Sequence, residues 1–262
     1  MTRRPVTDRP APAAIARFLR RRLERGVPYG LSATLAFVAV ALLLWGFVEV
    51  VDAVSEGDDL ARLDARAHEV VFNALGADPQ LGVAVTWFGN NLTLITFVVV
   101  ATLALVAAKR YWSAFRVAFA SGGGGLVVLG LKGLFHRARP VDQVIPAEGY
   151  SFPSGHAFAS TVFYGMLVYL VWRLTEKAWA RALAAVVGPL LIISVGLSRV
   201  YLNVHFLTDV VAGWLSGAAW LVASLLIVDL VETRFRGGNG RRAQPGDAGP
   251  QRHPARTASR TA

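Results

Sequence analysis

Long apolar stretches alternate with short polar segments along most of the chain. Several stretches reach the roughly 20 apolar residues that a bilayer core requires, and none alternates with the period of two typical of barrel strands. Because lipid admits only helices or closed barrels, the pattern predicts an all-α polytopic membrane protein, a bundle of six transmembrane helices. The expected spans lie near Leu31–Val51, from about Leu92 onward, and near Ala114–Leu134, Ala157–Leu174, Ala182–Leu197 and Leu207–Val231.

Two of these stretches allow a second interpretation. The first follows a basic patch and ends near "VDA" at Ala53, as a cleaved signal peptide would, but it exceeds the roughly 7–15 apolar residues of a signal core. We therefore expect a retained span. A surface segment through Trp87 precedes the second span. The third span contains the run "SGGGG" at Ser121–Gly125, which favours close helix packing over a phosphate-binding loop.

Charge defines the ends of the predicted domain and its orientation. The net charge is +10, with eight arginines in residues 1–25 and seven from Arg234 onward. We expect a basic cytoplasmic tail over 1–26, the six-span domain over 27–232, and a disordered basic cytoplasmic tail over 233–262. Such tails are typical of solvated ends near an anionic leaflet, and no nucleic-acid partner is expected. The chain has no cysteine, which excludes disulfides and thiolate sites.

The positive-inside rule places both termini in the cytoplasm of a multi-pass plasma-membrane protein. With this orientation, 20 of the 27 lysines and arginines fall in inner segments. The first outer loop, "SEGDDLARLDARAHE", is acidic. Four of the six cations on the outer side crowd into residues 132–139 and position 199, so a further explanation is needed for them.

Three polar segments meet the outer face where spans begin or end. They are "KGLFHRARP" (132–140), "PSGH" (153–156) and "SRVYLNVHFLTD" (198–209). Lys132 and Arg139 are seven residues apart, so a helix continuing to Pro140 would place both on one side; the alternative is two snorkelling cations. Ser154 and Gly155 suit an anion at a helix N-terminus, or form an ordinary helix cap.

The third segment carries the strongest chemical signal. His205 and Asp209 are four residues apart at the start of the sixth span, where they would face the same way. The carboxylate can accept from one imidazole nitrogen and leave the other as a nucleophile. Arg199 offers a planar fork matched to phosphate oxygens. The alternative is a structural Arg–Asp pair beside a spectator histidine.

Together the three segments hold the groups that metal-free phosphoryl transfer requires. Cations stabilise the equatorial oxygens, one histidine attacks in line, and another protonates the leaving oxygen. The competing use, a metal site, is disfavoured because Lys132, Arg139 and Arg199 would repel a metal ion. We expect no metal and no cofactor.

The pattern K-x6-RP, PSGH, SR-x5-H-x3-D resembles the three-part signature of the type 2 phosphatidic acid phosphatase family, which is related to the vanadium haloperoxidases. The matching residues are Lys132, Arg139, Pro140, Pro153, Ser154, Gly155, His156, Ser198, Arg199, His205 and Asp209. The signature covers residues 132–209, and the six-span layout extends the likeness to most of the chain outside the tails.

The resemblance implies a role for each of these residues. His205 would be the nucleophile that forms a phosphohistidine, oriented by Asp209, and His156 would be the general acid and then the base. Phosphate would be bound by Lys132, Arg139, Ser154, Gly155 and Arg199, while Pro140, Pro153 and Ser198 would shape the backbone. His136, Arg137 and Asp142 match no fixed position, and His68 and His253 are expected to be spectators.

The resemblance further implies a membrane lipid phosphatase acting at the outer face. Its substrate would be phosphatidic acid, phosphatidylglycerophosphate or undecaprenyl diphosphate, with membrane lipids around it and no obligate protein partner inferred. Two alternatives remain: a lipid phosphotransferase that uses a second lipid as acceptor, and a non-catalytic six-span binding or transport protein. A haloperoxidase is disfavoured because those relatives are soluble.

Overall fold

A computed structural model describes residues 30–56, 58–76 and 78–241, and within them the chain is helical and has no strands. The elements are α2 (Leu31–Glu56), α3 (Asp58–Leu75), α4 (Gln80–Thr86), η1 (Trp87–Gly89), α5 (Asn91–Ala107), α6 (Tyr111–Phe135), α7 (Gly155–Leu174), α8 (Ala178–Tyr201) and α9 (Leu207–Arg241). The all-α prediction is confirmed.

Within the described residues, five helices are long and apolar enough to cross a membrane: α2, α6, α7, α8 and α9. A sixth span results if α4 and η1 are joined to α5, from which they are bent by 41°. Asn90 forms the joint, where its side-chain oxygen caps α5 by accepting the N–H of Leu92 at 2.9 Å. The chain is thus a multi-pass membrane protein with up to six spans, and the expected surface segment through Trp87 is a short helical arm.

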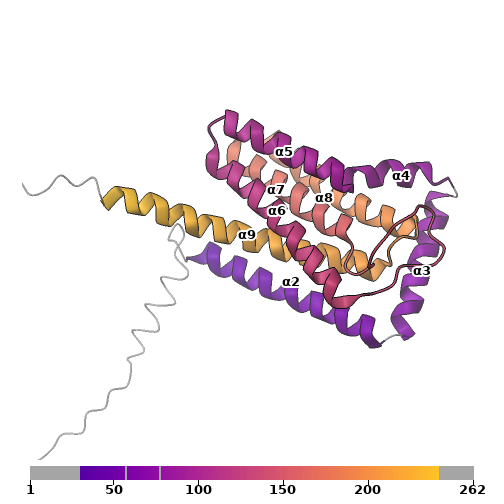
Figure 1. Cartoon of the computed structure of the whole chain (residues 1–262). Coiled ribbons are helices and arrows are strands. Elements are labelled where there is room, and N and C mark those ends of the chain that lie inside the picture. Colours follow the sequence, from indigo (N-terminus) through magenta and orange to yellow (C-terminus); the bar gives the residue numbers. More distant parts are fainter. Residues whose placement is uncertain (1–29, 57, 77, 242–262) are drawn as a thin grey trace, which may run out of the picture.

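Packing of the bundle follows from small residues at the helix crossings. α7 lies between α6, α8 and α9, while α2 runs alongside α9 (Figure 1). α7 and α9 approach so closely that a Cβ on Gly213 would lie 2.6 Å from the carbonyl oxygen of Ser154, and one on Gly217 would lie 2.8 Å from that of Phe158. This contact brings the start of α7 against the start of α9, which are two of the three signature segments.

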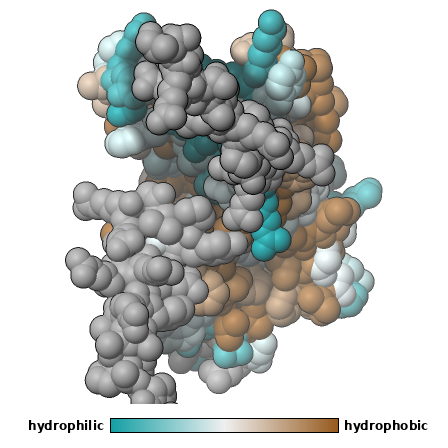
Figure 2. All heavy atoms as spheres, turned by 90° about the vertical axis from the view of Figure 1, so that its left-hand side faces the viewer, coloured by the Kyte–Doolittle hydropathy of each residue, from teal (hydrophilic) through white to brown (hydrophobic). Residues whose placement is uncertain are grey.

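The core is a layer of apolar side chains shared by α6, α7 and α9, including Val117, Phe158 and Met166. The outward faces are also apolar: Phe37 is 72% exposed and Leu126 is 73% exposed. Seen along the helices in Figure 2, hydrophobic residues cover the flank of the bundle and hydrophilic ones gather near its rim. Exposed apolar flanks of this kind are suited to lipid rather than water.

Most of the acidic segment that the sequence analysis places in the first outer loop is helix α3, which lies across one end of the bundle (Figure 1). Its inward residues, including Asp64, His68 and Phe72, follow the helical spacing of three to four residues. At the other end, α9 continues through residues 233–241, which the sequence pattern assigns to the C-terminal tail. The rest of the predicted tails, 1–26 and 242–262, lies outside the described residues.

Candidate active site

Lys132 joins the first signature segment to the second. It lies in the last turn of α6, where its Nζ donates to the carbonyl oxygen of Tyr150. Its Cε passes 3.7 Å from the position that a Cβ on Gly155 would occupy, at the first residue of α7. The side chain of Lys132 therefore lies at van der Waals distance from the start of α7.

Arg139 reaches the site from a loop, and the prediction that helix α6 carries it is wrong. The helix ends at Phe135, and His136 adopts the left-handed conformation that closes it, with φ of 47°. In the loop, Arg139 donates to the carbonyl oxygens of Val204 at 2.7 Å, Gly149 at 3.0 Å and Glu148 at 3.0 Å. Its Nη1 also lies 3.1 Å from His205 Nε2.

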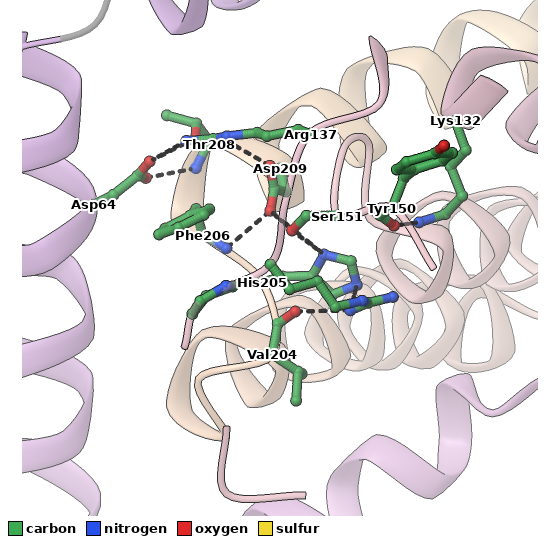
Figure 3. Close-up of polar contacts among 12 residues, drawn as sticks. Asp64, Lys132, Arg137, Tyr150, Ser151, Val204, His205, Phe206, Thr208 and Asp209 are labelled. Carbon is green, nitrogen blue, oxygen red and sulfur yellow. Dashed lines mark hydrogen bonds and ion pairs between the residues drawn. The ribbon is translucent and has the colours of Figure 1, made fainter. Parts of the chain in front are cut away.

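His205 and Asp209 meet, although the helix does not carry both. His205 precedes α9, whereas Asp209 lies in its first turn, and His205 Nδ1 is 3.4 Å from Asp209 Oδ2 (Figure 3). The same carboxylate oxygen accepts the backbone N–H of Phe206 at 2.9 Å, which caps the helix, and the hydroxyl of Ser151. Asp209 is fully buried, so these donors hold its charge in a fixed place.

The contacts of His205 define its tautomer. A guanidinium can only donate, so Nε2, which faces Arg139, carries the lone pair, and the proton resides on Nδ1 toward Asp209. Burial lowers the pKa of His205 to about 4, because the opposing effect of Asp209 is smaller and Arg139 and Arg199 disfavour the charged imidazolium. The imidazole is thus neutral at physiological pH, with Nε2 available as a nucleophile.

Arg199 and His156 complete the cluster from α8 and α7. Arg199 is buried, donates to Thr86 Oγ1 at 2.7 Å, and has an Nε without a hydrogen-bond partner among the described residues. His156 packs against Gly89, whose Cβ would lie 3.2 Å from the imidazole Cδ2. His156 is within electrostatic range of His205 and of Lys132, Arg139 and Arg199. The structure therefore brings both predicted catalytic histidines beside all three predicted phosphate-binding cations.

The remaining signature residues lie around this cluster. Ser154 is the N-cap of α7, donates its backbone N–H to the carbonyl oxygen of Asp209 at 2.9 Å, and has a buried hydroxyl without a partner among the described residues. Ser198 donates to the carbonyl oxygen of Val195 at 2.7 Å inside α8. Pro140 accepts from the Gln143 side chain, and Pro153 precedes the N-cap. Ser154 thus links the starts of α7 and α9.

Four polar residues at the site were missed by the sequence analysis: Asp64, Arg137, Ser151 and Thr208. Arg137 Nη1 donates to Asp209 Oδ1 at 2.6 Å and its Nη2 lies 3.1 Å from Asp64 Oδ2 (Figure 3). Asp64 also accepts the backbone N–H and the hydroxyl of Thr208 at 2.9 and 2.8 Å. Two sequence features could have pointed to part of this network: the acidic segment that contains Asp64, and the additional cation, Arg137, between Lys132 and Arg139.

The other histidines have separate surroundings. His68 Nδ1 lies 2.9 Å from the carbonyl oxygen of Val200, and His136 packs its ring against Tyr150 with centroids 4.5 Å apart. His253 lies outside the described residues. Within the described part of the chain, no group of three or more histidine or acidic side chains is arranged to hold a metal ion.

An apolar cavity of about 660 Å³ leads away from the site among α5, α6 and α7. Lys132 and Gly155 line it together with Asn91, and the rest of the wall is mainly aliphatic and aromatic, including Val98, Val128 and Phe158. The cavity therefore connects two phosphate-binding candidates, Lys132 and Gly155, to a long apolar wall. Its volume lies within the range of small-molecule sites.

Comparisons with known proteins agree with this arrangement. The family model of the PAP2 superfamily matches residues 94–232. Phosphatidylglycerophosphatase B of Bacillus subtilis is 28% identical over 135 residues, which cover 51% of this chain and 66% of that protein. Undecaprenyl-diphosphatase of Sulfolobus acidocaldarius is 39% identical over 116 residues, which cover 41% and 50%. The matches thus span between half and just under two thirds of these relatives.

Two solved structures share the fold. One is a transmembrane PAP2 type phosphatidylglycerolphosphate phosphatase from Bacillus subtilis, with a TM-score of 0.65 and 22% identity, covering 74% of this chain and 96% of that one. The other is Aquifex aeolicus LpxE, with a TM-score of 0.50 and 23% identity, covering 62% and 94%. Because the family match covers more than half of the sequence, the chain belongs to the PAP2 superfamily.

Proposed function

We propose that the protein is a membrane lipid phosphatase that works through a phosphohistidine on His205. The contact that carries the proposal is the alignment of Asp209, His205 and Arg139, which leaves His205 neutral with its lone pair on Nε2. Substrates are phosphate monoesters or diphosphates of lipids, namely phosphatidic acid, phosphatidylglycerophosphate or undecaprenyl diphosphate. The activities after which the two relatives are named, phosphatidylglycerophosphatase and undecaprenyl-diphosphatase, fall within this class.

The reaction has two displacements at phosphorus. In the first, His205 Nε2 forms the P–N bond while the bond from phosphorus to the leaving oxygen breaks, and His156 gives that oxygen a proton. In the second, His156 takes a proton from water as the water oxygen attacks phosphorus, and the P–N bond breaks to release inorganic phosphate. Asp209 balances the positive charge of the phosphorylated imidazole.

The three cations stabilise the charge on the transferred phosphoryl group. Lys132, Arg139 and Arg199 bind its oxygens, together with Ser154 and the N-terminus of α7 at Gly155. The Arg139 N–H that contacts His205 Nε2 moves to a phosphoryl oxygen when substrate binds, which frees the lone pair for attack. Arg139 therefore contacts the nucleophilic nitrogen of His205 in the free enzyme and a phosphoryl oxygen in the substrate complex.

Turnover by the purified protein tests this function. Wild-type protein in detergent with EDTA should release inorganic phosphate from at least one of the three lipid classes, and kcat/KM across the panel identifies the preferred one. His205→Ala should lower kcat by about 10³-fold or more, and rapid acid-quench labelling should find a phosphohistidine only when His205 is present. Phosphate release that survives in His205→Ala, or that requires a divalent ion, would reject the mechanism.

We also propose that the site faces the outside and that both termini are cytoplasmic, as the distribution of basic residues favours. The absence of native cysteine permits a direct test. Val141, 94% exposed in the loop after Arg139, and the side chain of Glu176, 97% exposed between α7 and α8, lie near opposite ends of the bundle. In intact cells, a membrane-impermeant thiol reagent should label Val141→Cys and not Glu176→Cys; the reverse result would invert the topology.

A further inference from the structure

We propose that the cavity among α5, α6 and α7 holds a hydrocarbon chain of the substrate and limits its length, an inference that rests on the proposed function. The cavity begins at Lys132 and Gly155, where the phosphate would be bound, and its wall includes the exposed apolar residues Ile95 and Leu129. An anion-binding end joined to an apolar wall fits an amphiphile with one phosphorylated end. The chemistry of the lining thus identifies the ligand as a long-chain lipid phosphate.

The glycine run of α6 serves two different purposes. Gly123 and Gly124 pack against α9, since a Cβ on Gly123 would lie 2.5 Å from the Trp220 ring and one on Gly124 would lie 3.1 Å from it. Gly122 and Gly125 line the cavity, as Gly124 also does, but a Cβ on Gly122 or Gly125 would meet no atom within 4 Å. Helix contact, as the sequence predicts, explains only the first pair. The second pair keeps the cavity wide.

Gly125 and Gly122 lie at two different depths along the cavity. Gly125 is seven residues before Lys132 in the helix, and Gly122 is ten, which places them about 10 Å and about 15 Å from the lysine along the axis. Side chains added at these positions would close the cavity at two depths. A short chain would end before either position, an intermediate chain would pass only Gly125, and a long chain would pass both.

The deep part of the cavity is marked by two hydroxyl groups. Ser121 on α6 and Thr102 on α5 line it, and their hydroxyls are buried without a hydrogen-bond partner among the described residues. Each is eleven residues, or about 16 Å, from the residue at the site end of its helix, Lys132 or Asn91. A hydrocarbon chain gains little beside unpaired hydroxyls, so we place the end of the chain near them.

Chain-length profiles of three variants test the inference. Purified Gly125→Leu, Gly122→Leu and the control Gly130→Leu are compared with wild type on dihexanoyl, didecanoyl and dipalmitoyl phosphatidic acid in mixed micelles. Gly130 also lies on α6 with no atom within 4 Å of its Cβ position, but it does not line the cavity. Leucine favours a helix more than glycine does, so the substitutions should not weaken α6.

Gly125→Leu should lower kcat/KM at least about tenfold for the didecanoyl and dipalmitoyl lipids and spare the dihexanoyl lipid. Gly122→Leu should impair only the dipalmitoyl lipid, and Gly130→Leu none. Equal effects on all chain lengths, or no effect of either cavity variant, would overturn the inference.

Photo-crosslinking, which does not depend on turnover, tests this inference separately from the proposed function. In the His205→Ala background, phosphatidic acid with a photoreactive diazirine at its chain end should crosslink to α5 or α6 near Thr102 and Ser121, and Gly122→Leu should abolish this crosslink. Crosslinking elsewhere would reject the cavity as the chain site, whatever the activity. Specific crosslinking with no wild-type turnover of any lipid phosphate would reject the phosphatase and leave the chain site standing.

A separate set of contacts supports a second inference: we infer that Arg137 and Asp64 are positioning residues for Asp209. Arg137 Nη1 donates to Asp209 Oδ1 at 2.6 Å, opposite the oxygen that faces His205. Asp64 holds Arg137 through Nη2 at 3.1 Å, and both contact Thr208. The two buried carboxylates thus share one guanidinium, and the orientation of Asp209 depends on both (Figure 3).

Asp64 extends this network to a helix outside the region that matches the family model. It lies on α3, before residues 94–232, and is 3% exposed. A buried carboxylate is costly unless it is paired. Asp64 is paired with Arg137, which also binds Asp209, and its hydrogen bonds with Thr208 fix α3 against the start of α9. Helix α3 is therefore part of the active site rather than a cover over it.

Kinetics of Arg137→Gln, Arg137→Lys and Asp64→Asn test the role, with Glu69→Gln on the exposed face of α3 as the control. Arg137→Gln should lower kcat about 10- to 100-fold with little change in KM, and Arg137→Lys should restore part of it. Because Asp209 would then interact more strongly with His205, the acid limb of kcat/KM should move to higher pH. The other titratable or charged side chains around His205, namely His156, Arg139 and Arg199, are unchanged in these variants.

Asp64→Asn should cause a smaller loss, and it should add little in the Arg137→Gln background because the two residues act through one contact. Glu69→Gln should match wild type. A purely structural role would lower the melting temperature without moving the acid limb or the ratio of kcat to KM effects. That result, or a fully active Arg137→Gln, would overturn the inference.

Discussion

The two ends of the bundle both carry buried charge, but they balance it differently. At the end away from the site, Arg116 contacts Asp229 and Glu232, and Glu232 also pairs with Arg173 at 3.6 Å and Arg236 at 2.6 Å. Every arginine of this far-end cluster therefore contacts a carboxylate. The cluster joins α6 and α7 to α9 and has no cation left for a ligand.

At the site end, Lys132, Arg139 and Arg199 contact only neutral groups among the described residues: carbonyl oxygens, the hydroxyl of Thr86 and the neutral His205. Arg137 forms ion pairs with both buried carboxylates nearby, Asp64 and Asp209. Three partly or fully buried cations without a carboxylate are costly unless an anion joins them. Unbalanced charge, rather than buried charge, therefore identifies the ligand site.

Breaking the far-end cluster should affect stability and spare chemistry. Arg116→Met would remove the shared partner of Asp229 and Glu232, but Asp229 is half-exposed and Glu232 keeps Arg173 and Arg236, so the loss should be below the about 3–5 kcal/mol typical of a fully buried pair. Thermal unfolding in detergent should show a lower melting temperature, while kcat per folded molecule stays near the wild-type value. A large loss of kcat in a folded Arg116→Met protein would contradict the distinction between the two ends.

Neutralising a cation at the site end should have the opposite effect. Arg199→Met removes a donor to the phosphoryl oxygens, and loss of one such donor typically lowers kcat by about 10²–10³-fold. The melting temperature should stay the same or rise, because Arg199 has no carboxylate partner among the described residues and its Nε has no partner. Full activity with reduced stability in this variant would reverse the assignment of the two ends.

The pH dependence of kcat/KM, through the pKa of His205, also distinguishes the two ends of the bundle. Burial and the nearby arginines lower the pKa of His205 to about 4, so the acid limb of kcat/KM should lie near that value rather than near the ordinary value of about 6.5. Arg139→Gln removes one of these charges and should move the limb to higher pH in the residual activity. Arg116→Met, at the far end, should leave the limb in place.

The same shift has a consequence for stability. Between pH about 6.5 and about 4, the unfolded chain binds a proton at His205 and the folded protein does not. The unfolded state therefore binds more protons in this window, and the contribution of His205 to the free energy of unfolding falls as the pH is lowered through it. Unfolding titrations of His205→Gln should lack this component, whereas an unchanged pH dependence would contradict a buried neutral imidazole.

The fold and much of this site follow from local sequence signals. Runs of apolar residues specify the spans, and the three polar segments must meet because each lies at the same end of neighbouring helices. Two local geometries differ from the sequence prediction: the spacing predicts helical positions for Arg139 and His205, and both residues lie in loops. In each case the predicted proximity holds, since tertiary contacts to the loop, such as those between Arg139 and Val204, replace the helical spacing.

The role of α3 could not be predicted, because its inward face carries polar residues. Asp64 and His68 find partners in Arg137 and in the carbonyl oxygen of Val200, far along the chain, and pattern analysis treats such residues as solvent-facing. The cavity is likewise invisible in the sequence. Four consecutive glycines give no sign that Gly123 and Gly124 pack against Trp220 while Gly122 and Gly125 do not.

The smallest expected effect comes from removing the Ser151 hydroxyl, a neutral hydrogen-bond partner of Asp209. The Ser151 hydroxyl donates to Asp209 Oδ2 and lies 3.3 Å from His205 Nδ1, so it shares the carboxylate oxygen that orients the nucleophile. Ser151→Ala leaves Arg137 and the Phe206 N–H on Asp209, and loss of one hydrogen bond to a charged group is worth about 1.5 kcal/mol, or roughly tenfold in kcat/KM. Ser198→Ala, whose hydroxyl contacts only its own helix, provides the matched control and should change kcat/KM less than twofold or so. Equal losses in the two variants would mean that Ser151 acts on the fold and not on the orientation of His205.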